Sequence, residues 1–190
     1  MLSRLTRAAI FLAAALASAS LPAAPPELER LLAGIASHGP RQVDYREERT
    51  SPLLASPIIS HGVLVNQASG RLIKQVIQPY YSRLEIDGDR LSISDGMREQ
   101  RLSLDRHPAL RGFVAAFRAT LSGDADSLRE HFHIELEGDD PAWRMTLVPR
   151  DESLRELLDR VVLTGQGSRI DSIGTEQPGG ERSVMRIDAG

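Results

Sequence analysis

Cysteine is absent from the 190-residue chain, and lysine occurs only once, as Lys74. The lack of cysteine excludes disulfides, thiol catalysis and cysteine metal sites. The net charge is −3, and no run of basic residues is present. Nucleic-acid binding needs a basic surface, so we expect no nucleic-acid partner.

Catalytic and phosphate-binding motifs are missing as well. The chain has no Gly-x-Ser-x-Gly nucleophile elbow, no phosphate loop and no dinucleotide fingerprint. His131 and His133 can share one strand face, but a zinc site needs three or four ligands and no partner motif is evident. Asp87 and Asp89 flank a glycine, where turn chemistry explains both residues. We therefore expect a protein that is not an enzyme and that binds no metal and no cofactor.

The N-terminus predicts where the protein works. Two arginines precede an apolar run over residues 8–17, and residues 17–19 form the small-x-small pattern Ala-Ser-Ala. This order is typical of a secretory signal peptide, and a membrane-spanning helix would need about 20 apolar residues. We expect a signal peptide over residues 1–19, cleaved near Ala19, and an exported, periplasmic protein. An uncleaved N-terminal anchor is the alternative.

The remaining chain, residues 20–190, has the size of one domain. Residues 82–105 show the clearest pattern, because apolar and polar residues alternate in three short runs with Asp-Gly turns among them. Alternation gives a sheet one apolar and one polar face, and Asp-Gly favours hairpins. A three-stranded antiparallel meander is predicted here. Further strands are predicted over residues 42–50, 58–66, 72–78, 132–137, 143–147, 161–163, 169–176 and 182–187.

Helical spacing appears in a few segments between these strands. Residues 26–37 and 107–121 carry apolar stripes, and residues 124–131 and 151–158 predict shorter helices. About ten strands joined mostly by hairpins, with helices that do not alternate with strands, indicate an α+β fold.

Only two long amphipathic helices are available to cover the apolar face of about ten strands. A curved, open sheet with helices across its mouth leaves an apolar volume, and such volumes are the usual ligand sites. Ordinary close packing is the alternative, and periodicity does not separate the two.

The order of these segments resembles the LolA-type periplasmic carriers of outer-membrane lipoproteins, and more closely a divergent LolA-related branch. No single motif is diagnostic. The segments that carry the resemblance are residues 45–49, 53–57, 62–64, 71–74, Pro79, 83–91, 121–124 and 143–149.

The resemblance implies a strongly curved, unclosed antiparallel sheet, a half-barrel with helices as a lid over an apolar cavity. It implies acylated lipoprotein or another lipid-like molecule as cargo, an inner-membrane transporter as donor and an outer-membrane acceptor. We expect a monomer. The better-known carriers have an Arg-Pro pair where this chain has Ala68 and Ser69. Arg71 is displaced from that position, so the transfer role of the family's arginine is not assigned to it.

On this basis we expect apolar side chains from both halves of the sheet and from the helix over residues 107–121 to surround the cargo. Plain core packing is the alternative for each of them. The expected lining is Tyr45, Val63, Val65, Leu84, Ile86, Leu91, Ile93, Trp143, Met145 and Leu147, and the expected lid is Leu110, Phe113, Val114 and Phe117.

Three functions remain open at this point. The first is a non-enzymatic carrier that shields acyl chains between the inner and the outer membrane. The second is a periplasmic lipid-sensing or regulatory module on the same fold, which acts through a protein partner. The third is a hydrolase, which would need a serine or histidine buried beside a carboxylate.

Overall fold

A computed structural model describes residues 27–38, 41–138 and 141–188. The predicted signal peptide lies outside these residues. Within them, four α-helices and eleven strands are present, one strand more than the ten or so expected. The helices are α1 (Glu27–Ser37), α2 (Pro108–Ser122), α3 (Ala125–His131) and α4 (Glu152–Arg155), with a 3-10 turn, η1 (Leu104–Arg106), before α2. The strands are β1 (Arg41–Thr50), β2 (Ile58–Asn66), β3 (Leu72–Gln78), β4 (Ser82–Asp87), β5 (Arg90–Ser94), β6 (Glu99–Ser103), β7 (Phe132–Glu137), β8 (Ala142–Pro149), β9 (Arg160–Gln166), β10 (Arg169–Glu176) and β11 (Arg182–Ile187).

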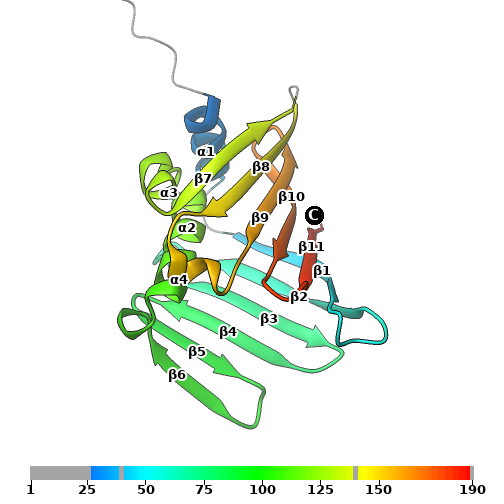
Figure 1. Ribbon diagram of the computed structural model, residues 1–190. Helices are drawn as coiled ribbons and strands as arrows, with labels where there is room; N and C mark the ends of the chain where they lie inside the picture. Colours follow the sequence, from blue (N-terminus) through cyan, green and yellow to red (C-terminus); the bar gives the residue numbers. More distant parts are fainter. Residues whose placement is uncertain (1–26, 39–40, 139–140, 189–190) are drawn as a thin grey trace, which may run out of the picture.

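All described strands belong to one antiparallel sheet with the order β6-β5-β4-β3-β2-β1-β11-β10-β9-β8-β7. Two meanders, β1 to β6 and β7 to β11, are joined where β1 pairs with β11. Because β6 and β7 are the two edges and do not pair with each other, the sheet stays open. It curves into a half-barrel (Figure 1), which confirms the predicted α+β fold.

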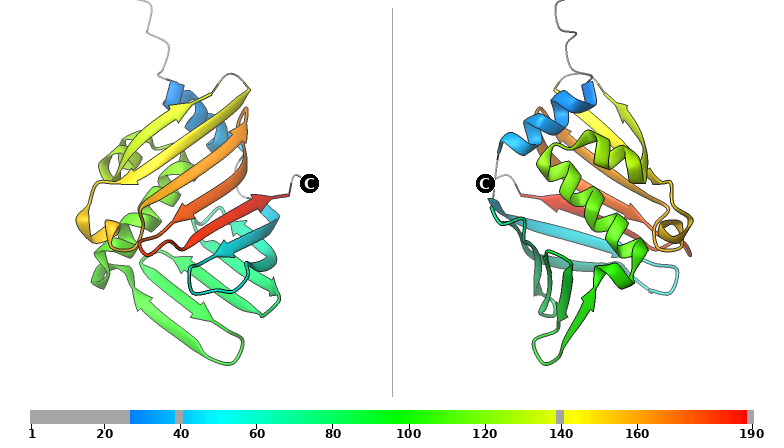
Figure 2. Two further views of the ribbon diagram at one scale, coloured as in Figure 1. Left: turned by 45° about the vertical axis from the view of Figure 1, so that its right-hand side comes forward. Right: turned by 90° about the vertical axis from the view of Figure 1, so that its left-hand side faces the viewer.

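Helices α1, α2 and α3 lie on one face of the sheet (Figure 2, right), which we call the inner face. The predicted start and end signals hold for the long helix. Pro108 occupies its first turn, and Gly123 ends it in the left-handed conformation, with φ of 80°. Asp124 then caps α3 by accepting a hydrogen bond from the Ser127 amide. Only one residue therefore separates α2 from the cap of α3, and the two helices form one compact unit over the sheet.

Local sequence also explains two irregularities in the sheet. Residues 51–57, with two prolines, form the loop between β1 and β2, as expected. The pairing of β2 with β3 shifts register between His61 and Gly62, so the strand glycine marks a bulge, as also expected. A side chain at Gly62 would overlap the Gln75 carbonyl oxygen, 1.9 Å from an ideal Cβ. This close approach of β2 and β3 requires glycine.

Candidate functional site

The part of the inner face formed by β4 and β5, with Leu72 of β3 and Leu102 of β6, is apolar and lies under α2. Directly paired residues of antiparallel strands share a face, and the register places Leu84 opposite Ile93 and Ile86 opposite Leu91. Val114 of α2 is buried against this region. The resulting cluster consists of Leu72, Ile86, Leu91, Leu104 and Val114, with Leu84, Leu102, Leu110, Phe117 and Leu121 packed against it and only partly buried. We call it the α2–β5 cluster.

A second and larger cluster lies under α1 and α3, on β7 to β9. Met145 and Leu147 are buried there, and Trp143 packs against its margin. The indole Nε1 of Trp143 donates a hydrogen bond to the Gly167 carbonyl oxygen, at 2.8 Å. Helix α2 contributes Ala116 and Ala119 to this cluster. The helix is therefore wedged between two apolar clusters, with one side of its surface against each.

The structure brings most of the predicted lining together, but not all of it. Eight of the ten predicted lining residues lie on the inner face by register: Tyr45, the four of β4 and β5, and the three of β8. Val63 and Val65 pair with Asp44 and Gln42, whereas Tyr45 pairs with Gly62. The side chains of Val63 and Val65 therefore point to the opposite, outer face, and we leave both valines out of the lining.

The predicted lid residues divide between the two clusters. Leu110, Val114 and Phe117 belong to the α2–β5 cluster, whereas Phe113 packs against the larger one. In this conformation the apolar side chains under α2 are in contact with one another, so any cargo on the inner face has to replace helix contacts.

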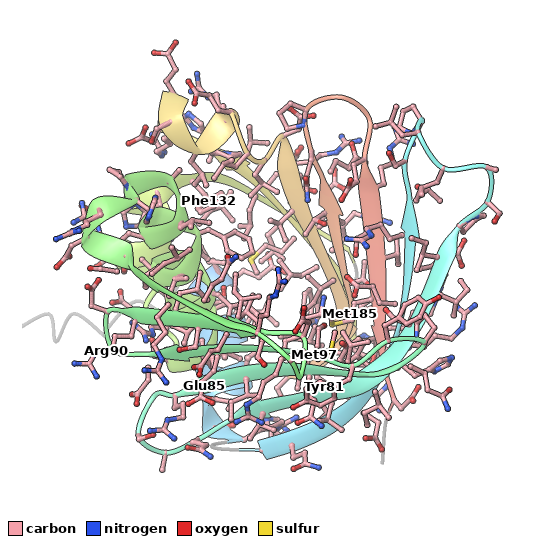
Figure 3. All side chains as sticks on the ribbon, turned by 90° about the horizontal axis from the view of Figure 1, so that it is seen from below. Tyr81, Glu85, Arg90, Met97, Phe132 and Met185 are labelled. Atoms are coloured by element: carbon pink, nitrogen blue, oxygen red, sulfur yellow. The ribbon has the colours of Figure 1, made fainter. Side chains whose placement is uncertain are left out.

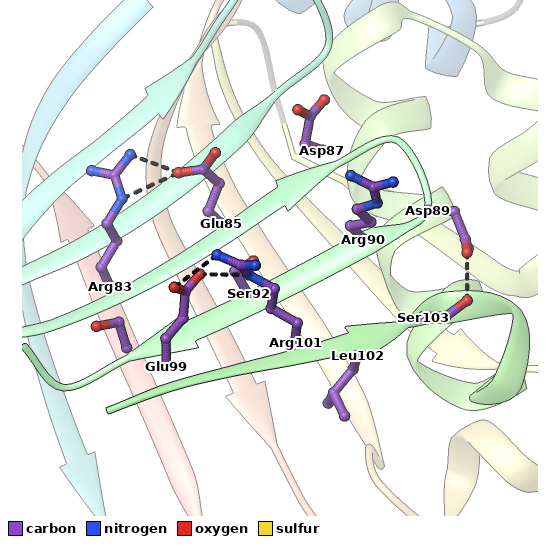
Figure 4. Close-up of a pocket in the computed structure, with 11 residues that line it drawn as sticks. Arg83, Glu85, Asp87, Asp89, Arg90, Ser92, Glu99, Arg101, Leu102 and Ser103 are labelled. Atoms are coloured by element: carbon purple, nitrogen blue, oxygen red, sulfur yellow. Dashed lines mark hydrogen bonds and ion pairs between the residues drawn. The ribbon is translucent and has the colours of Figure 1, made fainter. Parts of the chain in front are cut away.

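A broad hollow of about 980 Å³ lies on the outer face of β4 to β6, and sequence reasoning did not anticipate it (Figure 4). It is lined mainly by charged and hydroxyl side chains, among them Arg83, Glu85, Glu99 and Arg101. These pair with one another: Arg83 Nη2 lies 2.7 Å from Glu85 Oε2, and Arg101 Nη2 lies 3.0 Å from Glu99 Oε2. No residue of the predicted lining borders this hollow.

Arg71 also belongs to the outer face. Its Nη2 lies 2.7 Å from Asp87 Oδ2, and its Nε lies 3.5 Å from Glu85 Oε1. Both acidic residues line the charged hollow. The arginine that stands near the family's transfer position is therefore held on the side of the sheet away from α2.

Polar side chains gather on the inner face of the central strands β1, β3 and β11. Lys74 Nζ lies 2.7 Å from Glu47 Oε2, and the Ser183 hydroxyl donates to Glu47 Oε1. Burial alone would raise the pKa of Glu47, but the Lys74 ammonium and the hydrogen bonds from Lys74 and Ser183 hold it below its ordinary value. The Lys74 ammonium also lies 5.6 Å from the ring centroid of Tyr45. We call Tyr45, Glu47, Lys74 and Ser183 the central polar group.

Sequence reasoning missed this group, although signals for it exist. Tyr45 was expected to point inward, and strand alternation then places Glu47 inward as well. Lys74 is the one lysine of the chain. Tyr45 itself is only 1% exposed, and burial followed by the Glu47 charge raises the pKa of its phenol well above the ordinary value. The phenol is therefore a neutral donor.

Exposed apolar side chains mark the hairpin tips at one end of the sheet. They come from the β1–β2 loop, the end of β3, the β3–β4 turn and the β5–β6 turn. Two of them, Tyr81 and Met97, are labelled in Figure 3. The Tyr81 ring lies 3.2 Å from the Cβ position of Gly96, so the two turns touch. This rim consists of Leu53, Leu54, Ile77, Tyr80, Tyr81 and Met97.

Neither a membrane-spanning helix nor a cluster of metal ligands is found in the part of the chain that the structure describes. None of the helices in residues 27–38, 41–138 and 141–188 combines the length and the apolar character that crossing a membrane requires. The same ranges contain no group of three or more His, Asp or Glu side chains placed to hold a metal ion.

Solved structures with a similar fold are distant in sequence. A LolA superfamily protein from Nitrosomonas europaea, NE2245, is 13% identical over 84% of this chain and 90% of that chain, with a TM-score of 0.45. MucB, solved with MucA from Pseudomonas aeruginosa, is 12% identical over 84% of this chain, which spans only 55% of that chain, with a TM-score of 0.45. The Mycobacterium tuberculosis lipoprotein LppX is 12% identical over 83% of this chain and 93% of that chain, with a TM-score of 0.39.

Sequence comparison defines the family more firmly. No curated protein matches the chain. The model of the family described as outer membrane lipoprotein carrier protein LolA-like matches residues 19–187, which is most of the sequence and nearly all of the described structure. The chain therefore belongs to the LolA-like family of outer membrane lipoprotein carrier proteins.

Proposed function

We propose that this protein is a periplasmic carrier that shields the acyl chains of a lipoprotein or another lipid-like cargo during transfer from the inner to the outer membrane. The observation that carries the proposal is the family match over residues 19–187. The apolar inner face under α2 supports it, because concave apolar surfaces covered by movable elements are suited to ligands. The signal peptide expected over residues 1–19 would provide the export.

The α2–β5 cluster is where we expect the acyl chains to enter. The strands beneath this cluster, β4 to β6, form one edge of the open sheet. Three residues of α2 that pack against it, Leu110, Phe117 and Leu121, are only partly buried. The other side of α2 packs against the larger cluster, in which Leu32, Leu128 and Met145 are fully buried. Lifting α2 from β4 and β5 therefore separates side chains that are already partly exposed, while the other side of the helix stays against α1 and α3.

Exchange of helix contacts for cargo contacts makes such binding reversible. Each CH₂ group removed from water contributes roughly 0.8 kcal/mol. An acyl chain that replaces Val114 and Phe117 on the sheet restores the burial of Leu84 and Leu91, while the uncovered helix residues contact the chain. The net free energy is then a difference between two similar packings, so a carrier of this kind can release what it binds.

A carrier also has to meet a donor and an acceptor. The rim at the hairpin tips presents six large apolar side chains to solvent, and exposed apolar patches of this kind are typical of interaction surfaces. We infer an inner-membrane transporter and an outer-membrane acceptor as partners from the family alone.

Native mass spectrometry of protein purified from the periplasm tests the proposal. We expect lipid-bound species that survive purification, and movement of a labelled acyl cargo from donor to acceptor vesicles at a rate that rises with protein concentration. Binding without any transfer would instead favour a lipid-sensing module. Protein that is always empty and takes up no offered lipid would contradict both functions.

A further inference from the structure

We propose that the central polar group, together with Arg49, holds an acidic head group of the cargo, a phosphate or a carboxylate, while the acyl chains lie under α2. This proposal rests on the carrier function proposed above and adds the class of lipid that is carried. Tyr45, Glu47, Arg49 and Ser183 share the inner face by register, and Lys74 reaches them from β3.

The polarity of the inner face changes along the strands. Leu72, Ile86 and Leu91 lie under α2. Two residues after Leu72, the inner face of β3 carries Lys74. On β1, the inward residues that follow Tyr45 are Glu47 and Arg49, which pair with Met185 and Ser183 of β11. A lipid has the same sequence of apolar and polar parts, so the surface fixes which way round a cargo would lie.

Lys74 has the donor capacity that such a head group needs. An ammonium group has three N–H donors, and among the described residues its one hydrogen-bond partner is Glu47, at 2.7 Å. The Lys74 side chain is 31% exposed, whereas that of Glu47 is 14% exposed. The ammonium is therefore held by Glu47, and its other N–H donors have no hydrogen-bond partner among the described residues.

The charge of the site favours an anion. Glu47 is compensated by Lys74 and accepts a hydrogen bond from the Ser183 hydroxyl, so each of its oxygens already accepts a hydrogen bond. Arg49 lies two residues along the same strand and lowers the pKa of Glu47 through its charge, and within the described residues it forms no ion pair. Two cations against one anion leave one positive charge, and hydrogen bonds to charged groups are stronger than those between neutral groups.

Tyr45 supplies an independent observation. Its hydroxyl is buried and has no hydrogen-bond partner among the described residues. It lies 2.9 Å from the Cβ position of Gly62, on the side of β1 that faces β3 and Lys74. A buried hydroxyl without a partner is unfavourable, and a head-group oxygen beside Lys74 would offer it an acceptor when the site is filled.

The test compares dodecyl phosphate with 1-dodecanol, which has the same chain and no charge. Because Lys74 is the one lysine, reductive methylation with ¹³C-formaldehyde gives a single lysine NMR signal, alongside that of the N-terminal amine, to follow binding. We expect dodecyl phosphate to bind about tenfold more tightly and to shift the Lys74 signal. Inorganic phosphate alone should produce no shift, and a shift would overturn the proposal in favour of free phosphate as the ligand.

Two variants locate the effect. Arg49→Met leaves the Lys74–Glu47 ion pair in place and should reduce the preference for the phosphate severalfold without changing the affinity for 1-dodecanol. Lys74→Met combined with Glu47→Gln avoids a buried lone carboxylate, removes the ammonium donors and leaves Arg49, and it should also reduce the preference severalfold. Equal affinity of the unmodified chain for both lipids, or a preference that is unchanged in both variants, would overturn the head-group site alone. Failure of both lipids to bind would overturn the carrier function and this proposal with it.

Discussion

Ile93→Asp is expected to weaken the binding of an acyl chain by at least about tenfold. Ile93 lies on the inner face at the margin of the α2–β5 cluster and is 39% exposed. Loss of contact with two or three CH₂ groups, at roughly 0.8 kcal/mol each, accounts for this effect. An ionised carboxylate beside hydrocarbon adds to it. Titration with a fluorescent palmitoyl probe measures the change.

The matched control is Val184→Asp. Val184 is 38% exposed, which is nearly the same as Ile93, but it pairs with Glu48 and lies on the outer face. We expect its affinity for the probe to equal that of the unmodified chain. Circular dichroism should show both variants folded, since neither site is buried. An equal loss of affinity in the two variants, or no loss in either, would contradict the assignment of the inner face.

Gly62→Ala is expected to lower the free energy of unfolding by about 1–3 kcal/mol. A methyl group there would lie 1.9 Å from the Gln75 carbonyl oxygen and 2.9 Å from the Tyr45 hydroxyl. Strand β2 would have to move away from β3, or the tyrosine ring away from Lys74. Urea unfolding followed by circular dichroism measures the difference.

Gly174→Ala provides the comparison within the same sheet. Its Cβ would meet no atom closer than 3.6 Å, and its φ lies outside the left-handed region. This substitution should be neutral or should stabilise the protein by up to about 1 kcal/mol, because it restricts the unfolded chain. Similar stability losses in the two alanine variants would show that the contact between β2 and β3 is not the cause.

Much of the fold could be predicted because its signals are local. The Asp-Gly turns beside β5 and the glycine after α2 all adopt positive φ, and such turns specify hairpins and helix ends without reference to distant residues. The cap at Asp124 and the bulge at Gly62 are further local features that the sequence indicated correctly.

The placement of Val63 and Val65 could not be predicted in the same way. Strand β2 has apolar residues on both faces, with Ile58 and Leu64 inward and Ile59, Val63 and Val65 outward. Alternation identifies a buried face only where the other face is polar. The assignment requires the register with β1, which depends on residues that are distant along the chain.

The central polar group depends on the same non-local information. Glu47 and Lys74 are separated by 27 positions. Glu47 stands in a run of charged residues, and Lys74 is the one charged residue of its strand. In sequence both look like solvent-exposed strand residues. Only the pairing of β1 with β2 and of β2 with β3 brings them together on the inner face.

Photo-crosslinking with a palmitoyl probe that carries a diazirine at the chain end tests most directly whether acyl chains lie between α2 and the sheet. Mass spectrometry of the cross-linked peptides identifies the labelled residues. We expect label on Leu84 and Ile93 of the sheet and on Phe117 of α2. Label confined to outer-face residues, such as Val63 of β2 or Ser92, which lines the charged hollow, would contradict binding between α2 and the sheet.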